Sequence, residues 1–368
     1  MNFGLTDEQE LLKEAAHGAL SRVKTVEAAR EALDGSELPD LWPAAVEAGW
    51  PGLLMSEAGG GAGLDPLDAM LVFSELGRVL ASVPLLGHLP ATLLVDAGAD
   101  AADVEPLASG ERRAAYVAAK PPSAIEEAWS TDPRSGLRRG PAPVIDGGRV
   151  TGEAAWVPDA PGADVLVVVG AEGRVAVVRA ADAQVEPVAG YDATRSLGHV
   201  RFDGAPATEL ELPAGTAATA WYVAQTLLAA EAVGAIELAL DTSVQYAKER
   251  FTFGRAIGSY QAVKHELVEI LRRLENARSL MFYAGWAAQD EPAELPVAAS
   301  AFRLVASEAY DHAARTQISV HGGIGATWEH DAPLYFRRAQ LAKRLLGGTG
   351  DAADRVADEL FAQARAAG

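Results

Sequence analysis

Two stretches in the C-terminal third constrain the fold most. The first reads Tyr246-Ala247-Lys248-Glu249-Arg250-Phe251-Thr252-Phe253-Gly254-Arg255-Ala256-Ile257-Gly258-Ser259-Tyr260-Gln261-Ala262-Val263. The second reads His321-Gly322-Gly323-Ile324-Gly325-Ala326-Thr327-Trp328-Glu329-His330. The guanidinium of Arg250 and the hydroxyl of Thr252 suit phosphate oxygens, and paired glycines suit a close approach of the backbone to another group. Both stretches are therefore candidates for a binding site.

Long helical segments surround these stretches. Residues 216–250 contain no proline and only one interior glycine, Gly234. Residues 259–289 and 296–320 are predicted to form two further long helices. Apolar residues in the first segment recur at a loose helical spacing: Leu227, Ala230, Val233, Ile236, Leu240 and Val244. We expect a bundle of long antiparallel helices with one buried face on each.

The middle of the chain has a different pattern of apolar residues. Short apolar runs lie at residues 114–119, 165–169, 175–178 and 200–202, bounded by Gly, Pro and Asp. Buried strands have this pattern, and about a hundred residues of it predict a small sandwich or barrel.

The first hundred residues are predicted to be helical. Thr6 and Gln9 have the spacing of a capping box before an apolar-periodic segment. The glycine run at residues 59–63 lies between two helical segments, so we expect a plain loop rather than a phosphate-binding turn. The fold class is therefore α+β multidomain: a helical domain over 1–110, a β domain over 111–212 and a helical bundle over 213–368.

Composition excludes several classes of function. The net charge of −20 opposes binding to nucleic acid and to anionic membrane surfaces. The chain has no cysteine, so disulfides, thiolate nucleophiles and cysteine metal sites are absent, and we predict no metal site. The N-terminus has no secretory pattern, and no uninterrupted apolar run reaches the roughly 20 residues needed to cross a bilayer. We expect a cytoplasmic protein without membrane insertion.

Further matches extend over nearly the whole chain. They are Phe3-x-Leu5-Thr6-x-Glu8-Gln9, Leu41-Trp42 with Gly49-Trp50, Gly60-Gly61-Ala62-Gly63-Leu64, Glu75-Leu76-Gly77-Arg78 and Asp192-Ala193-Thr194-Arg195-Ser196. With the two C-terminal stretches, in this order, the chain resembles the acyl-CoA dehydrogenase family. The resemblance implies an N-terminal α domain, a middle β domain and a C-terminal four-helix bundle. It also implies FAD as cofactor and an acyl-CoA thioester as substrate.

The resemblance assigns cofactor-binding roles. Arg250, Thr252, Phe253 and Gln261 fall on the family pattern that reaches across a dimer, where the Arg binds the pyrophosphate of the neighbouring subunit's flavin. Gly322 and Gly323 match a place where backbone approaches the cofactor. The alternatives are a surface ion pair between Arg250 and Glu249, and a simple break between helices at the two glycines.

The residue that the family uses as catalytic base is missing. In most members a Glu precedes Gly-Thr, and this chain reads Leu346-Gly347-Gly348-Thr349. In other members the Glu lies on the helix before the Arg motif, at a position that falls near Ala224. We therefore assign no catalytic residue. Glu231 and Asp351 are possible substitutes, although a buried helix Glu is more often the partner of a core Arg.

Other positions depart from the family as well. Residues 118–124 lack the hydroxyl and glycine pattern that holds the flavin of the same subunit, and Ser319 stands where a Gln is usual, with Gln317 upstream. The resemblance thus implies that the Arg250-x-Thr252-Phe253-Gly254 motif, which reaches a neighbour's flavin, is intact, whereas the contacts to the chain's own flavin are eroded. In this respect the chain resembles the Glu-lacking subunit of actinobacterial heterotetrameric acyl-CoA dehydrogenases, which implies a Glu-bearing partner.

Three hypotheses of function follow. The first is a non-catalytic subunit of a heteromeric FAD-dependent acyl-CoA dehydrogenase, inactive without its partner. The second is a self-sufficient homo-oligomeric enzyme that uses Glu231 or Asp351 as base. The third is a binding or scaffold protein on the same fold without redox chemistry. Flavin content, alone and with a partner, separates the three.

Overall fold

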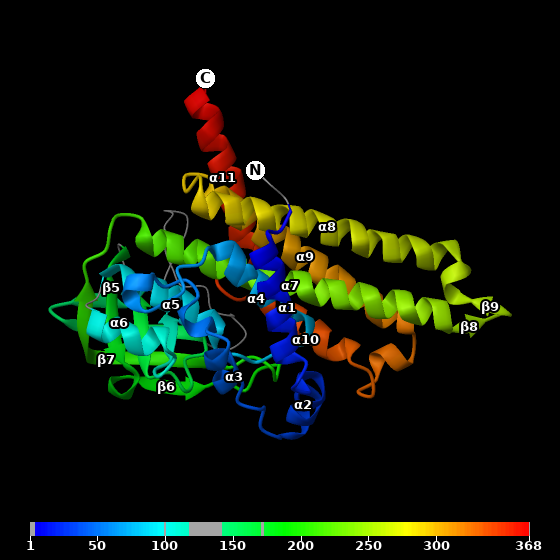
Figure 1. The fold of residues 1–368 in the computed structure, drawn as a ribbon, viewed down its shortest axis with the longest axis horizontal. Helices are drawn as coiled ribbons and strands as arrows, with labels where there is room; N and C mark the ends of the chain where they lie inside the picture. The colour runs from blue at the N-terminus through cyan, green and yellow to red at the C-terminus, as the bar shows by residue number, and fades with distance from the viewer. Residues whose placement is uncertain (1–3, 99–100, 118–141, 171–172, 368) are drawn as a thin grey trace.

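The computed structural model describes residues 4–98, 101–117, 142–170 and 173–367. Helices come first, a β region follows, and long helices complete the chain (Figure 1). The strands lie at one end of an elongated molecule, and a small hairpin of β8 (Phe251–Thr252) and β9 (Arg255–Ala256) lies at the other. The predicted α+β class is confirmed. The domain boundaries near residues 110 and 212 stay a prediction.

Six α-helices form the N-terminal part. They are α1 (Asp7–Leu20), α2 (Thr25–Glu31), α3 (Trp42–Glu47), α4 (Pro66–Arg78), α5 (Leu85–Gly98) and α6 (Ala101–Ala108). The capping box at the start of α1 is present: Gln9 N donates to Thr6 Oγ1 at 3.2 Å, and Thr6 N donates to Gln9 Oε1 at 3.1 Å. Glycines 60–63 lie in the loop before α4, as expected.

The β region has seven strands in the described chain. They are β1 (Ala114–Val117), β2 (Val144–Asp146), β3 (Arg149–Pro158), β4 (Val165–Val169), β5 (Val175–Arg179), β6 (Gln184–Pro187) and β7 (Leu197–Leu210). Their order is β1-β4-β5-β7-β3-β2, with β6 also on β7; all pairs are antiparallel except β1 with β4. The C-terminal residues of β7 pair with β5, and its first ten residues pair with β3 and β6. This strand therefore joins the two halves of the β region.

The two halves of the β region enclose a core of their own. Leu166 and Val168 of β4 pack in one cluster with Val200 and Phe202 of β7. The alternate residues of β4 join the main helical core, where α5 contacts β1. Because both faces of β4 are buried, residues 165–169 are apolar without alternation. The predicted sandwich or barrel thus takes the form of a sandwich joined through β7.

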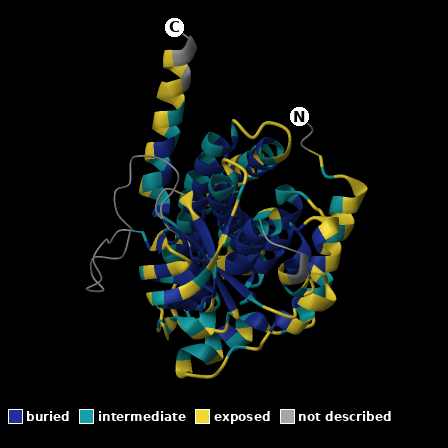
Figure 2. Ribbon diagram, turned by 90° about the vertical axis from the view of Figure 1, so that its left-hand side faces the viewer, coloured by how far each residue is buried: buried dark blue, intermediate teal, exposed yellow. Residues whose placement is uncertain are grey.

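Five helices form the C-terminal part. They are α7 (Thr216–Glu249), α8 (Gln261–Gln289), α9 (Leu295–His321), α10 (Ala332–Ala342) and α11 (Gly348–Ala367). The long helices α7, α8 and α9 lie side by side, and the outer part of α11 projects from the body (Figures 1 and 2). The β8–β9 hairpin between α7 and α8 was not predicted from the sequence.

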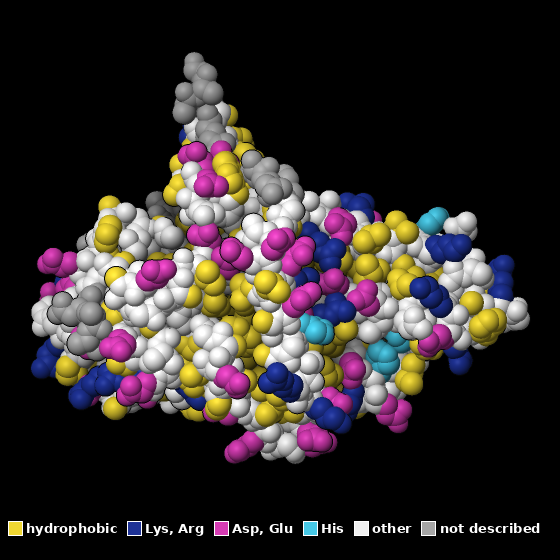
Figure 3. Space-filling view, viewed as in Figure 1, with side chains coloured by type: hydrophobic (Ala, Val, Ile, Leu, Met, Phe, Trp, Pro, Cys, Tyr) yellow, Lys and Arg dark blue, Asp and Glu magenta, His cyan; other side chains and the backbone are white. Residues whose placement is uncertain are grey.

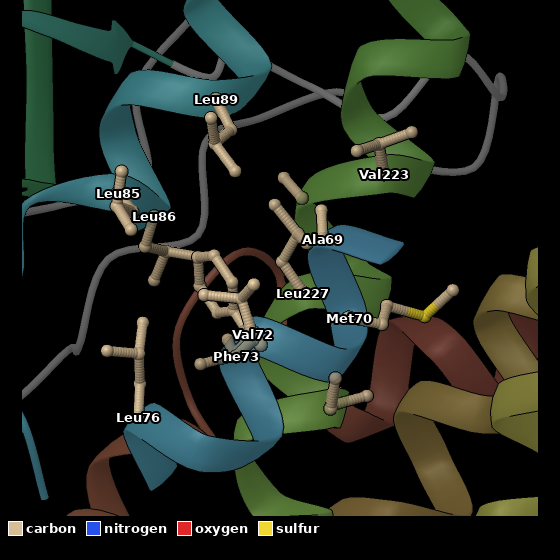
Figure 4. Close-up of a cluster of buried hydrophobic side chains, with 14 of the residues drawn as sticks. Ala69, Met70, Val72, Phe73, Leu76, Leu85, Leu86, Leu89, Val223 and Leu227 are labelled. Atoms are coloured by element: carbon tan, nitrogen blue, oxygen red, sulfur yellow. The ribbon is translucent and has the colours of Figure 1, made fainter. Parts of the chain in front are cut away.

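The helix α7 is the centre of the molecule. It packs against α4, where a Cβ on Gly234 would lie 1.7 Å from Ser74 O and a Cβ on Gly77 would lie 1.9 Å from Glu231 O. Only glycine permits this approach, which explains the single interior glycine of α7. Side chains of α4 fill the space between α5 and α7 (Figure 4).

Helix α7 is more apolar than we expected from the sequence, which has no uninterrupted apolar run of membrane-spanning length. By length and composition this helix could cross a bilayer, but 83% of its most apolar window is buried inside the protein. The helix is therefore a core helix, not a membrane span.

Candidate functional site

The end of α7 presents an exposed cation beside exposed aromatic rings. Arg250 caps α7 with extended backbone angles, so the chain leaves the helix there and turns into the β8–β9 hairpin. Phe251 is 63% exposed and Phe253 is 95% exposed. Phe253 also has a φ of +49°, a strained conformation for a residue with a side chain. Strain and exposed aromatic surface together are typical of a site that contacts another group.

Arg250 is free of the ion pair considered as its alternative role. Among the described residues its guanidinium has no hydrogen bond and no carboxylate within ion-pair distance, and Glu249 instead accepts a hydrogen bond from Gln245. The guanidinium of Arg250 is therefore available to a phosphate.

An open groove of about 440 Å³ begins at the hairpin. Its walls come from the hairpin, the start of α8 and the end of α9, and include Thr252, Phe253, Tyr260 and Ser319. Gln261 is the first residue of α8 and is exposed beside this groove. Lys and Arg side chains gather at this end of the molecule on the face drawn in Figure 3. The structure thus brings Arg250, Thr252, Phe253 and Gln261 to one end of the bundle.

The glycine motif lies at the same end. The ring of His321 lies 4.4 Å from that of Tyr246 on α7 and 4.3 Å from that of His330. Gly322 ends α9 with a φ of +64°, and a Cβ at Gly322 or Gly323 would meet no atom within 4 Å. The backbone there ends a helix and also faces open space, so a cofactor could approach it.

The sequence departs from the family pattern at two places on the flavin side: at Ser319, with Gln317 upstream, and at residues 118–124. Ser319 lines the groove, but Gln317 is buried and donates to Thr242 Oγ1 at 2.9 Å, so it does not replace the usual Gln. Residues 118–124 lie outside the described residues. The described residues at this end of the bundle present groups that suit a phosphate-bearing cofactor: a free guanidinium, a hydroxyl, an exposed aromatic ring and open backbone.

The two positions expected for a base lie around one loop. Gly347 has a φ of +87°, and its Cβ would lie 3.0 Å from Asp351 Oδ2 and 3.5 Å from Trp221 Cζ2. Ala224 is fully buried on α7, and the adjacent Gln225 donates to the carbonyl of Leu346. Trp221 therefore occupies space beside the missing side chain. The sequence analysis did not identify Trp221, because no motif marks it.

Glu231 is engaged by two arginines. Its carboxylate accepts from Arg195 and from Arg338, and all three side chains are buried. The expectation of a core arginine partner is confirmed. Because both carboxylate oxygens already bind guanidinium groups, Glu231 is poorly placed to take a proton from a substrate.

The same network explains the turn at residues 192–196. Arg338 Nε donates to Asp192 Oδ2 at 2.5 Å, and Arg338 Nη2 donates to Thr194 O at 2.8 Å. Burial alone would raise the pKa of Asp192, but the charge of Arg338 and hydrogen bonds from Thr194 outweigh it and hold that pKa low. This motif of the sequence is thus structural, and it locks the β region to α7 and α10.

Asp351 is the remaining candidate for a substitute catalytic base. It lies in the first turn of α11, and its Oδ2 is buried without a hydrogen-bond partner among the described residues. No cluster of three or more metal-binding side chains occurs in the part of the chain that the structure describes.

Comparison with known families agrees with this geometry. A model of the acyl-CoA dehydrogenase N-terminal domain matches residues 6–105, and one of the C-terminal domain matches residues 215–360. The acyl-CoA dehydrogenase IpdE2 of Mycobacterium tuberculosis is 33% identical over 365 residues, covering 96% of this chain and 98% of IpdE2. The chain belongs to the acyl-CoA dehydrogenase family. FAD is the cofactor of this family, and its homologues include enzymes of sterol and fatty-acid metabolism.

Two further matches are informative. The acyl-CoA dehydrogenase FadE34 of the same organism is 36% identical over 360 residues, covering 94% of this chain. The chain spans only 47% of FadE34, about half its length. Among solved structures, the ChsE4-ChsE5 complex from Mycobacterium tuberculosis matches with a TM-score of 0.84 and 26% identity, covering 98% of this chain and 99% of that one.

Proposed function

We propose that this chain is the Glu-lacking subunit of a heteromeric acyl-CoA dehydrogenase. With a Glu-bearing partner it oxidises an acyl-CoA thioester to the enoyl-CoA. The observation that carries the proposal is Gly347: the family's base position has no side chain, and Trp221 and Asp351 occupy the space around it. The likeness to ChsE4-ChsE5, a complex of two named components, supports a heteromeric assembly.

The residues of this chain would complete a flavin site on the partner. Arg250 would bind the pyrophosphate, Thr252 would donate from its hydroxyl, and Gln261 would supply an amide nearby. Phe253 would cover apolar surface, and the backbone at residues 322–323 would approach the cofactor. FAD held by these residues would supply the hydride acceptor for the β carbon of the thioester. The partner's carboxylate would remove the α proton, because this chain has glycine at the family's base position.

A cytoplasmic location and three domains with boundaries near residues 110 and 212 belong to the same proposal. The free guanidinium and exposed aromatic rings at the hairpin support an oligomer that forms through the C-terminal bundle, as homo- or hetero-oligomer.

Flavin content and subunit composition test the proposal. The chain would be purified alone, and also from its native host together with whatever accompanies it. We expect a colourless chain alone and a yellow complex that contains a second, Glu-bearing acyl-CoA dehydrogenase chain. Flavin with ordinary turnover in the chain alone would contradict this, and flavin in neither preparation would favour the scaffold function.

A second candidate is a self-sufficient enzyme with Asp351 as base. The buried, unpartnered Oδ2 of Asp351 beside the Gly347 position favours it. This candidate predicts turnover by the isolated chain that Asp351→Asn reduces about 100- to 10,000-fold. Glu231→Gln serves as the comparison, because the Glu231 carboxylate is held by arginines and should not affect the chemical step.

A further inference from the structure

A cluster of polar side chains is buried around the loop between α10 and α11. We name it the Arg355 cluster, and it consists of Trp221, Gln225, Arg303, Asp351 and Arg355. Three contacts hold it together: Gln225 donates to Leu346 O, Arg303 donates to Leu345 O at 3.1 Å, and the Arg355 guanidinium lies 5.8 Å from the Trp221 ring centroid. The cluster therefore joins α7, α9 and α11.

Arg355 is a buried charge without a protein acceptor. Its side chain is 3% exposed, and among the described residues it makes no hydrogen bond and has no carboxylate within 4.0 Å. Its buried, unpaired nitrogens are Nε and Nη2. These two N–H groups lie on one edge of the guanidinium and point the same way, which is the fork that binds a carboxylate through two parallel hydrogen bonds. A buried charge without a partner is strongly unfavourable, so this edge favours an anion.

The neighbouring groups of the cluster add donors of the same kind. Trp221 Nε1 and Arg303 Nε are also buried without acceptors in the described part of the chain. Burial, followed by the charge of Arg355, lowers the pKa of Arg303 to about 10, which leaves it protonated at neutral pH. Arg303 and Arg355 are therefore both charged, and neither forms an ion pair in the described part of the chain, so the cluster has a surplus of positive charge that suits a small anion.

Acceptors in the cluster do not remove this surplus. Gln225 Oε1 and Asp351 Oδ2 are buried and unpaired in the described part of the chain, and Asp351 forms no ion pair with Arg355 although it lies one helical turn away. Asp351 is partly exposed, so the cluster reaches the surface alongside it.

We infer that the Arg355 cluster is a binding site for a small monocarboxylate. The Nε and Nη2 groups of Arg355 form the bidentate contact, and Trp221 Nε1 and Arg303 Nε are the further unpaired donors of the cluster. The site lies on this chain alone and does not depend on the proposed role in a heteromeric enzyme.

Thermal unfolding of the full-length chain in sodium acetate tests the site, with sodium chloride at the same ionic strength as reference. We expect acetate to raise Tm in a saturable manner. Arg355→Lys keeps the charge but loses the fork, so it should weaken the apparent acetate affinity at least about tenfold. Arg344→Gln is the matched control: this exposed arginine lies in the same loop, outside the cluster, and its loss should leave the acetate response unchanged.

Two results would overturn the inference. One is an equal response of the wild-type and Arg355→Lys chains to acetate, including no response in either. The other is stabilisation of Asp351→Asn by acetate without any in the wild type, because Asp351 would then itself fill the fork.

A crystal grown with bromoacetate gives a readout that does not depend on variants that fold. An anomalous bromine peak with the carboxylate against Nε and Nη2 of Arg355 is expected. A water molecule or the Asp351 carboxylate at that edge contradicts the inference.

Discussion

The two ends of α7 differ in almost every physical respect. The N-terminal half, around Trp221 and Glu231, is buried, and its polar groups face other parts of the same chain. The C-terminal end, at Arg250 and the hairpin, is exposed, and its guanidinium has no partner among the described residues. Changes at the first end should therefore act on folding, and changes at the second should act on binding.

The largest effect is expected at the closest helix crossing. Gly234→Ala places a methyl group 1.7 Å from the backbone oxygen of Ser74, and backbone cannot move aside as a side chain can. We expect a loss of about 3 kcal/mol or more in the free energy of unfolding, measured by chemical denaturation. Gly323→Ala is the control, because its new methyl group meets nothing within 4 Å and should change stability by less than about 0.5 kcal/mol. Similar losses in the free energy of unfolding for the two variants would contradict the close contact between α4 and α7.

The next effect is expected at the buried ion network. Glu231→Gln removes the charge that faces Arg195 and Arg338, and loss of one partner from a buried pair typically costs about 3–5 kcal/mol. The amide still accepts a hydrogen bond, so we expect the lower part of that range in denaturation experiments. Glu237→Gln, at a partly exposed carboxylate that pairs with Arg278 and Arg78, should cost under about 1 kcal/mol. Turnover of the folded complex should hardly change; a specific loss of turnover would make Glu231 a catalytic residue.

A pH-dependent effect is expected at Asp159. This carboxylate accepts from Gly87 N at 2.8 Å, and burial raises its pKa to about 6 despite the opposing charge of Arg195. The folded state therefore favours the protonated acid. The resulting stability is complete below the unfolded pKa near 4 and disappears as pH rises through 6.

The comparison with Asp159→Asn measures that contribution. The free energy of unfolding of the wild type, relative to the variant, should fall by ~2–3 kcal/mol between pH 4 and pH 7. Parallel pH profiles for the two proteins would show that Asp159 has an ordinary pKa.

The smallest effect on folding, and a clear effect on binding, is expected at the exposed end. Arg250→Ala should change stability by less than about 0.5 kcal/mol, because the guanidinium has no partner within the described chain. In the complex it should weaken flavin binding by roughly 1.5–3 kcal/mol, or about 10- to 150-fold, measured by flavin titration. Arg255→Ala is the control on the same hairpin, since Arg255 stacks on Tyr260 and should affect binding much less. Equal losses would indicate a general charge effect.

The sequence predicts the exposed end better than the buried one. Arg250, Thr252 and Gln261 belong to one contiguous sequence motif, so identifying the motif identifies all three residues. Trp221, Arg303 and Arg355 come together only through the packing of α7, α9 and α11. They are far apart in the sequence, so no sequence spacing predicts that they are neighbours. The hairpin at residues 251–256 was missed because its strands are two residues each, too short for a period of two to be visible.

The order of the β strands is similarly hidden. Alternating and continuous apolar runs indicate strands, but the parallel pairing of β1 with β4 depends on which segments meet in space. Residues 118–124, whose changed pattern entered the functional argument, lie outside the described residues and leave that part of the prediction untested.

The strand β7 has a consequence for biosynthesis. It is the last strand of the β region along the described chain, and it pairs with all three of β3, β5 and β6. A ribosome delivers the chain from its N-terminus, so the two halves of the sandwich must wait for residues 197–210 to emerge before they can be joined. Until then, β5 and β3 present unpaired backbone edges to other nascent chains. Translation speed just beyond residue 210 therefore sets how long those edges stay open.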